Sequence, residues 1–112
     1  MLIQYVDQVN NMPLFIVKKE VFEWIERGLK TVELRRGKAK AGNEAVFQCG
    51  RNILKGKIIE KKEGTLFNLL DNIDFKEAIP TANSAQEVIA YIKNLYGKID
   101  GTFTAYRFAL TR

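Results

Sequence analysis

Three charged side chains near one turn of the chain are the first candidates for chemistry. Gly28 ends a helical pattern and allows a tight reversal, so we expect Lys30 to emerge where the chain turns. Glu33 and Arg35 follow in an alternating segment, which places both side chains on one side of a strand. A lysine and an arginine suit a bound phosphate, with a carboxylate to fix the guanidinium. The spacing therefore predicts an anion site, although the carboxylate and guanidinium also fit a surface ion pair worth less than about 1 kcal/mol.

Further basic residues surround this motif. Residues 27–40 carry a net charge of +5, equal to that of the whole 112-residue chain. Such a local concentration favours an anionic partner, although a solvated basic face has the same composition. The residues that we expect to follow a nucleic-acid backbone are Arg36, Lys38, Lys40, Lys55 and Lys57. The aromatic residues that suit stacking on an unpaired base, or equally the core of a small barrel, are Trp24, Tyr91 and Tyr106.

The composition excludes several chemistries. There is no histidine, which rules out Ser-His-Asp triads and His-ligated zinc. Cys49 is the single cysteine, so one chain has neither an internal disulfide nor a thiolate zinc site, and we expect this residue to be a small buried one. We therefore expect no metal site and no cofactor.

The N-terminal segment is set apart by a turn signal at residues 10–13. We expect residues 1–11 to be an arm or an extra edge strand, and residues 12–112 to form one domain. No apolar stretch approaches the roughly 18 residues of a membrane helix, and no secretory signal is evident. A cytoplasmic protein without membrane contact is expected. The oligomeric state is left open, with a monomer slightly favoured.

Hydrophobic periodicity divides the domain into strands and helices. The predicted order is strand 14–17, helix 19–28, strand 31–35, strand 45–49, strand 53–61, a short helix opening at 64–65, a capped helix 84–97 and strand 102–110. The first strand is an apolar run typical of a buried strand. Ser84 and Glu87 fit a capping box, which explains this serine better than nucleophilic chemistry does.

The order of these elements indicates the fold class. Strands outnumber helices and are not separated by helices in a regular alternation, which favours an α+β domain. We expect a mostly antiparallel sheet of about five to six strands, curled into a small barrel with helices packed at its ends.

Residues 28–35 resemble the signature G-x-K-x-x-E-x-R of the ASCH domain, a branch of the PUA-like superfamily. Helix 19–28 with its tryptophan, Ile79-Pro80 ahead of the capped helix, and the aromatic last strand are also similar to archaeal and bacterial members. The resemblance covers about residues 12–110. It implies a PUA-like β-barrel with a cleft beside the first helix, lined by Lys30, Glu33 and Arg35.

The superfamily is associated mainly with RNA. The resemblance therefore implies an RNA-binding module that holds single-stranded or modified RNA, or a nucleotide, in a basic cleft. We expect binding to be weak and steeply salt-dependent, with a log–log slope near −3 if about four phosphates are engaged.

The alternative is a small hydrolase of modified nucleosides, or a ribonuclease, because a few ASCH members are enzymes. In that case Lys30 acts as base or oxyanion donor and Glu33 is its partner carboxylate. The amidohydrolase branch has a threonine nucleophile where this chain has Glu33, and its catalytic glutamate shortly before the last helix has no clear counterpart here, since the nearest acid, Glu77, lies upstream. The two hypotheses differ in whether Glu33 pairs with Arg35 alone or also faces an open pocket together with Lys30.

Overall fold

The computed structural model describes residues 12–111, so the predicted arm at residues 1–11 lies outside the described residues. The elements are β1 (Leu14–Ile16), α2 (Lys19–Glu26), β2 (Val32–Arg36), β3 (Glu44–Cys49), β4 (Asn52–Gly64), α3 (Leu66–Leu70), α4 (Phe75–Ala78), α5 (Ala85–Tyr96) and β5 (Phe103–Leu110). The strands form one sheet in the order β1-β3-β4-β5-β2. Only the β1–β3 pair is parallel, and the other three pairs are antiparallel.

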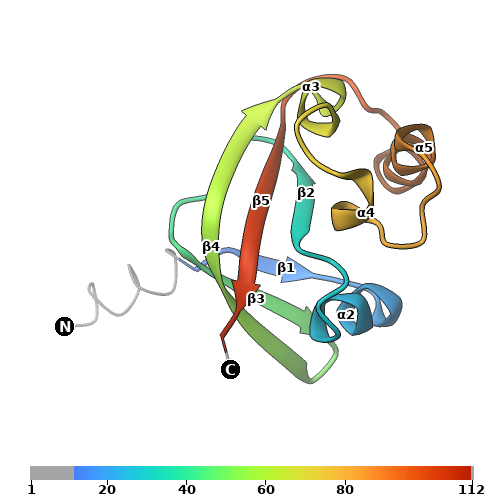
Figure 1. Ribbon diagram of the computed structural model, residues 1–112. Coiled ribbons are helices and arrows are strands. Elements are labelled where there is room, and N and C mark those ends of the chain that lie inside the picture. Colours follow the sequence, from blue (N-terminus) through green and yellow to red (C-terminus); the bar gives the residue numbers. More distant parts are fainter. Residues whose placement is uncertain (1–11, 112) are drawn as a thin grey trace.

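The long strand β4 curls the sheet. Its residues 52–57 pair with β3, and its residues 56–64 pair with β5, with a register shift between Ile58 and Glu60. Such a bulge bends a strand and increases its twist. Gly56 lies where the two pairings overlap, and a Cβ there would stand 3.0 Å from the carbonyl oxygen of Ala109. A glycine is therefore favoured at this close approach, and Figure 1 shows the curved half-barrel. The predicted small α+β barrel is confirmed at this level.

The curl turns the two end strands, β1 and β2, toward each other. The Nη2 atom of Arg35 on β2 donates a hydrogen bond to the carbonyl oxygen of Ile16 on β1, at 3.0 Å. Within residues 12–111, β1 and β2 are the two ends of the strand order. A side chain thus bridges the open seam of the half-barrel.

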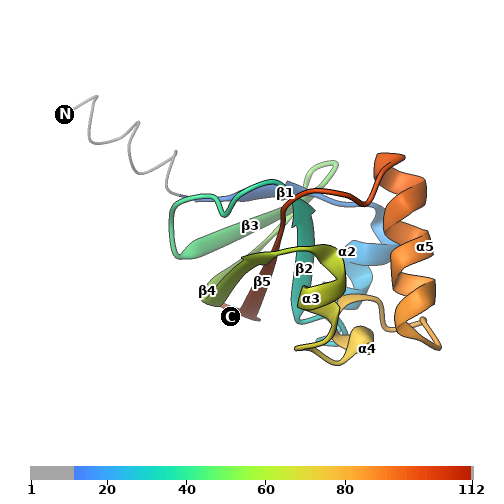
Figure 2. The same cartoon turned by 90° about the horizontal axis from the view of Figure 1, so that it is seen from above.

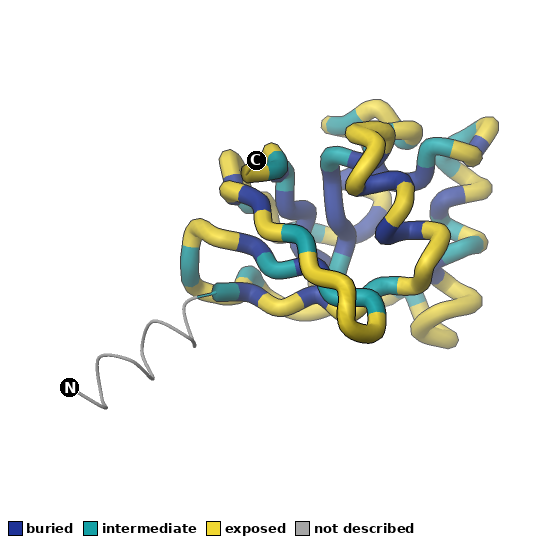
Figure 3. The backbone as a smooth tube through the Cα atoms, turned by 90° about the horizontal axis from the view of Figure 1, so that it is seen from below, coloured by how far each residue is buried: buried dark blue, intermediate teal, exposed yellow. Residues whose placement is uncertain are grey.

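Aromatic side chains fill the concave side of the sheet. Phe15, Phe47, Phe103 and Tyr106 are among the most fully buried side chains, and Figure 3 shows that buried segments alternate with exposed ones along the strands. In β1 the pattern is exposed, buried, exposed, because successive side chains of a strand point to opposite faces and only Phe15 faces the core. The prediction of a buried first strand was therefore wrong for all but Phe15.

The helices α2, α4 and α5 gather at the side of the sheet where β2 forms the edge (Figures 1 and 2). Ser84 caps α5 by accepting from the Glu87 amide at 3.2 Å, which is one of the two hydrogen bonds of the predicted capping box. The four-residue helix α4 was not predicted; its capping box joins Asp74 and Glu77. No helix in the described part of the chain has the length and apolar character needed to cross a bilayer.

Candidate functional site

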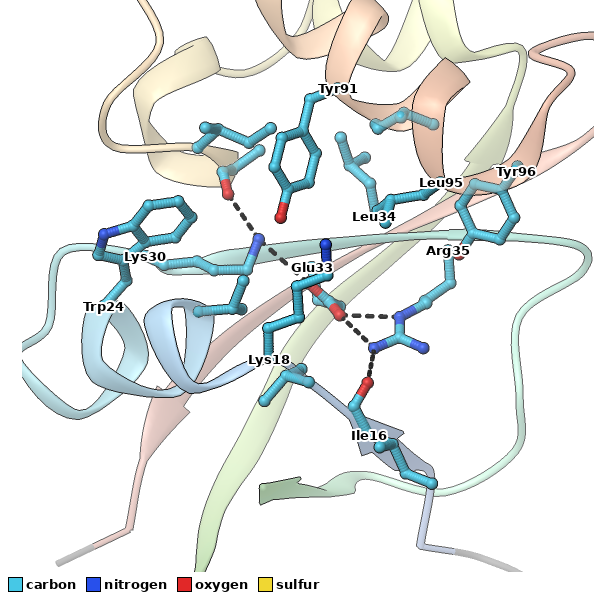
Figure 4. A pocket seen from close by; sticks show the side chains of 15 residues that line it. Ile16, Lys18, Trp24, Lys30, Glu33, Leu34, Arg35, Tyr91, Leu95 and Tyr96 are labelled. Atoms are coloured by element: carbon cyan, nitrogen blue, oxygen red, sulfur yellow. Dashed lines mark hydrogen bonds and ion pairs between the residues drawn. The ribbon is translucent and has the colours of Figure 1, made fainter. Parts of the chain in front are cut away.

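A cavity of about 280 Å³ lies between α2, the start of β2 and α5. Most of its wall is apolar and includes three aromatic rings, those of Trp24, Tyr91 and Tyr96 (Figure 4). Its charged lining residues are Lys18, Lys30, Glu33 and Arg35. Ligand sites commonly measure roughly 300–1,000 Å³. The cavity therefore has room for one small molecule or one base, with polar groups concentrated at a few points.

Gly28 directs the chain from α2 into the cavity wall. Its φ of +75° is in the left-handed region that favours glycine. After this residue, the amides of Leu29 and Lys30 both donate to the Trp24 carbonyl, at 2.9 and 3.2 Å. The chain reverses at the end of the helix, as the sequence predicts, and brings the Lys30 side chain beneath Tyr91 and beside Trp24.

Lys30 is buried, and all of its donor capacity is used within the protein. Its Nζ donates to the carbonyl oxygens of Val32 at 2.9 Å and Ala78 at 2.5 Å. It also lies 3.1 Å from Glu33 Oε1. An ammonium group has three protons, so these three partners account for all of them. Lys30 ties β2 to the end of α4 and fixes one oxygen of Glu33.

Glu33 is held on its other oxygen by Arg35. The Arg35 Nε donates to Glu33 Oε2 at 2.8 Å, and the Arg35 Nη2 lies 2.7 Å from the same oxygen. Burial by itself raises the pKa of Glu33, but the positive charges and hydrogen bonds of Lys30 and Arg35 outweigh it and lower the pKa below its ordinary value. Glu33 is therefore an ionised and firmly positioned acceptor in the cavity wall.

Three polar groups at the cavity keep unused hydrogen-bonding capacity. Arg35 Nη1 and Lys18 Nζ make no hydrogen bond or ion pair to residues 12–111. Figure 4 shows Lys18 and the Tyr91 hydroxyl reaching toward the centre of the cavity. Desolvation, followed by the charges of Glu20 and Glu33, raises the pKa of Tyr91, so its hydroxyl stays protonated. These groups are the ones available to a ligand.

Five of the predicted residues meet at this cavity: Trp24, Lys30, Glu33, Arg35 and Tyr91. The predicted residues that do not line it are Arg36, Lys38, Lys40, Lys55 and Lys57. Arg36 instead donates to the Lys98 carbonyl at 2.8 Å and pairs with Asp100 at 3.3 Å. The expected basic cleft is in the structure a mostly apolar cavity, because the basic loop and β4 carry their charges elsewhere on the surface.

Several other candidates are placed outside the cavity. Tyr106 is fully buried, and its hydroxyl accepts from the Lys40 amide at 3.0 Å, so it offers no stacking surface. Glu77 is bound by Arg107 and Thr31 rather than facing the cavity. Cys49 is a half-buried free thiol rather than a fully buried residue. No group of three or more His, Cys, Asp or Glu side chains in residues 12–111 is arranged to hold a metal ion.

Lys18 and Tyr96 line the cavity but were not predicted as site residues. Lys18 is the N-cap residue of α2, and its side chain makes no capping hydrogen bond. It reaches the cavity because the turn from β1 into α2 faces β2 across the open seam. No short-range spacing connects residue 18 with residues 30–35, so only the lack of a capping residue type before α2 marks this position as unusual.

Comparisons with known proteins give the fold. No model of a known protein family matches the sequence, and no curated protein does. Among solved structures, the hypothetical protein PH0355 has a TM-score of 0.75 at 16% identity, over 89% of this chain and 99% of its own. Protein PF0455 of Pyrococcus furiosus has a TM-score of 0.67 at 15% identity, over 90% of this chain and 98% of its own.

An ASCH protein from Zymomonas mobilis is also similar, with a TM-score of 0.64 at 21% identity, over 89% of this chain and 68% of its own. The same protein is matched in the form of an S128A mutant at a TM-score of 0.65. These structures match the half-barrel and the helices beside it. The chain therefore has the fold of the ASCH domain.

Proposed function

We propose that the cavity binds one unpaired nucleotide unit, and that the chain thereby acts as a module for single-stranded or modified RNA or for a nucleotide. The observation that carries this proposal is the combination of three aromatic rings with an ionised, immobilised Glu33 around a cavity of about 280 Å³. A base is flat and apolar on its faces and polar at its edges, and protein sites for unpaired bases combine the same two kinds of surface.

The cavity supplies both kinds of contact. Trp24, Tyr91 and Tyr96 offer faces or edges for stacking. Glu33 accepts a hydrogen bond from an exposed base edge, while the Tyr91 hydroxyl both donates and accepts. Because Glu33 is held from two sides by cations, it does not have to reorganise when a ligand arrives. Preorganisation of this kind reduces the entropic cost of binding.

The surface lysines and arginines have a separate role in this proposal. Arg36, Lys38, Lys40, Lys55 and Lys57 lie outside the cavity, and they would contact the backbone of an RNA whose one unpaired base enters it. Such contacts release counterions and make the affinity fall with salt. A log–log slope near −3 corresponds to about four phosphates on single-stranded RNA.

The test fills the cavity without breaking its ion pairs. Leu95 lines the cavity and is half exposed, so Leu95→Trp narrows the cavity at little cost in stability. Leu29 is equally exposed at 50% and does not line the cavity, which makes Leu29→Trp the matched control. We expect short single-stranded RNA to bind the wild type and Leu29→Trp, and to bind Leu95→Trp about tenfold or more weakly.

Binding is measured by ¹H–¹⁵N NMR titration at several salt concentrations. Trp24 is the single tryptophan of the wild type and lines the cavity, so its indole N–H signal, which comparison with the wild-type spectrum separates from that of the introduced tryptophan in each variant, reports on the site. A shift of this signal on RNA addition supports the proposal. Equal binding by both variants, or RNA binding that leaves the indole signal unmoved, would place the RNA elsewhere and overturn it.

Hydrolysis of a modified nucleoside or of RNA is a second candidate, which one observation favours. Glu33 is paired with Lys30 as well as Arg35, and both Lys30 and Glu33 line the cavity. The bonding of these residues speaks against it, since Lys30 has no free proton and the lowered pKa of Glu33 makes its carboxylate a weak proton acceptor.

The decisive assay is turnover of a panel of nucleoside amides and RNA oligomers by the wild type. We expect activity that is lost in Lys30→Met and Glu33→Gln and kept in Glu77→Gln, if the chain is such a hydrolase. Chemical denaturation of each variant accompanies the assay, because breaking a buried pair lowers stability. Absence of turnover by the wild type rejects this second candidate.

A further inference from the structure

The charges at the cavity do not cancel. Lys30 and Glu33 compensate one another at 3.1 Å, and Lys30 is saturated by two carbonyl oxygens. Arg35 shares the same carboxylate at 2.7 Å, so Lys18, Lys30 and Arg35 face the cavity with Glu33 as the one carboxylate among its lining residues. Glu20 is near enough to raise the pKa of Tyr91 but does not line the cavity. The cavity therefore has a positive balance that a neutral ligand would not compensate.

Lys18 and Arg35 both lie near the end of β1. Lys18 follows β1 directly, and Arg35 is bound to the carbonyl of Ile16, the last residue of β1. Figure 4 shows the Lys18 side chain pointing to the centre of the cavity and the Arg35 guanidinium above Ile16, whereas Trp24 and Lys30 lie on the opposite side. An anionic group on the Ile16 side of the cavity is thus near the guanidinium of Arg35 and the exposed side chain of Lys18, at a distance from the Trp24 end.

The orientation of Arg35 suits this role. Its Nε and Nη2 atoms are fixed by Glu33 and the Ile16 carbonyl. The remaining Nη1 is held by the planarity of the guanidinium and has no partner within the described residues. Lys18 adds a mobile point charge, since its side chain is exposed and takes no part in capping α2. An arginine with a fixed plane and a lysine with a free ammonium are a common pair of phosphate ligands.

We infer that Lys18 and the Nη1 group of Arg35 together bind a phosphate, so that the ligand of the cavity is a phosphorylated nucleoside and not a free nucleoside. This rests on the proposed function, which places the base among the aromatic rings. Lys30, in contrast, is a positioning residue for Glu33 and does not bind the phosphate. A phosphate monoester of a free nucleotide and a phosphodiester within RNA share this chemistry, and the ligands tested below distinguish them.

The experiment compares the four common ribonucleosides with their 5′-monophosphates, using NMR titration of the Trp24 indole and backbone amide signals. We expect a monophosphate to bind about tenfold or more tightly than its nucleoside, because a hydrogen bond to a charged group adds substantially to the binding free energy. Lys18→Gln should reduce this preference about tenfold.

Lys19→Gln is the matched control, because it removes the same charge from the adjacent exposed position and does not line the cavity. We expect Lys19→Gln to keep the wild-type preference for the monophosphate within about twofold, as for a screened surface charge. A loss in Lys19→Gln equal to that in Lys18→Gln would mean a general charge effect and would overturn the assignment of Lys18.

Two further outcomes separate this inference from the function on which it rests. If nucleosides and monophosphates bind with equal affinity, the phosphate site is rejected and the proposed base-binding cavity stands. If neither class shifts the Trp24 indole signal, both proposals fail. A dinucleoside monophosphate that binds as tightly as the mononucleotide identifies RNA as the source of the phosphate, whereas binding of the mononucleotide alone identifies a free nucleotide.

Discussion

Two carboxylate clusters adjoin the start of β2, and their surroundings differ. Glu33 binds Lys30 and Arg35, and the side chains of Lys30 and Glu33 are 6% and 7% exposed. Glu77 binds Arg107 and accepts from the Thr31 hydroxyl at 3.2 Å, with side chains that are 29% and 32% exposed for Glu77 and Arg107. Only the first cluster borders the cavity.

Similar ionic chemistry therefore has two different uses in this molecule. At the surface, Glu77 ties α4 to β2 and β5, and water screens its charge. In the cavity wall, Glu33 is desolvated, so its energy depends strongly on whether both cations remain in place. A carboxylate near basic residues therefore indicates a candidate site only when it is buried and also lines a cavity.

The largest expected effect is on stability when the buried cluster is broken. Glu33→Ala leaves Lys30 buried without its carboxylate, and we expect the free energy of unfolding to fall by about 3–5 kcal/mol in urea denaturation. The double variant Lys30→Met/Glu33→Leu removes both buried ions and should recover much of this loss. A loss under about 1 kcal/mol for Glu33→Ala would mean that the buried pair contributes no more to stability than a surface pair does, and it would contradict the proposed difference between the two clusters.

The pH dependence of stability tests whether the folded protein holds Glu33 in its ionised form. Because the pKa of Glu33 is lower in the folded protein than its ordinary value of 4.5, the folded state favours the ionised form. This contribution is fully present above that value and is lost as the pH falls through the folded pKa. We expect the stability difference between wild type and Glu33→Gln to be largest near neutral pH and to shrink below pH 4.5.

Denaturation curves of both proteins, measured across the acid range, check this dependence. The Glu77 pKa is also lowered, first through its hydrogen bond from Arg107, so the difference between wild type and Glu33→Gln is needed to isolate Glu33. A difference that stays constant down to the acid transition would show that Glu33 is not held ionised by its neighbours.

The smallest expected effect belongs to the surface cluster. A double-mutant cycle with Glu77→Gln and Arg107→Gln should give a coupling energy of about 0.2–1 kcal/mol, decreasing with added salt. Ligand titrations of the Trp24 indole should be unchanged in both single variants, because neither residue lines the cavity. A change in ligand affinity would show that α4 transmits its position to the cavity through Ala78.

Local sequence was sufficient for part of the site. The glycine at position 28 and the alternation of residues 31–35 predicted that Lys30 follows a turn and that Glu33 and Arg35 share a side of a strand. The observed Arg35–Glu33 contacts agree with this spacing. The bonding of Lys30 to the Ala78 carbonyl was not predictable, because its partner is 48 residues away in a helix with no strong periodic signal.

The sequence by itself determined every element type except the short helix α4, together with the mostly antiparallel sheet and the charged motif, since these depend on periodicity and on residues a few positions apart. Only the tertiary structure decided which cations are free. It paired Lys30 internally, turned Arg36 toward Asp100 and brought Lys18 into the cavity. The physical reason is that a side chain's binding capacity is what remains after its long-range neighbours have used its protons, and those neighbours are set by the curl of the sheet.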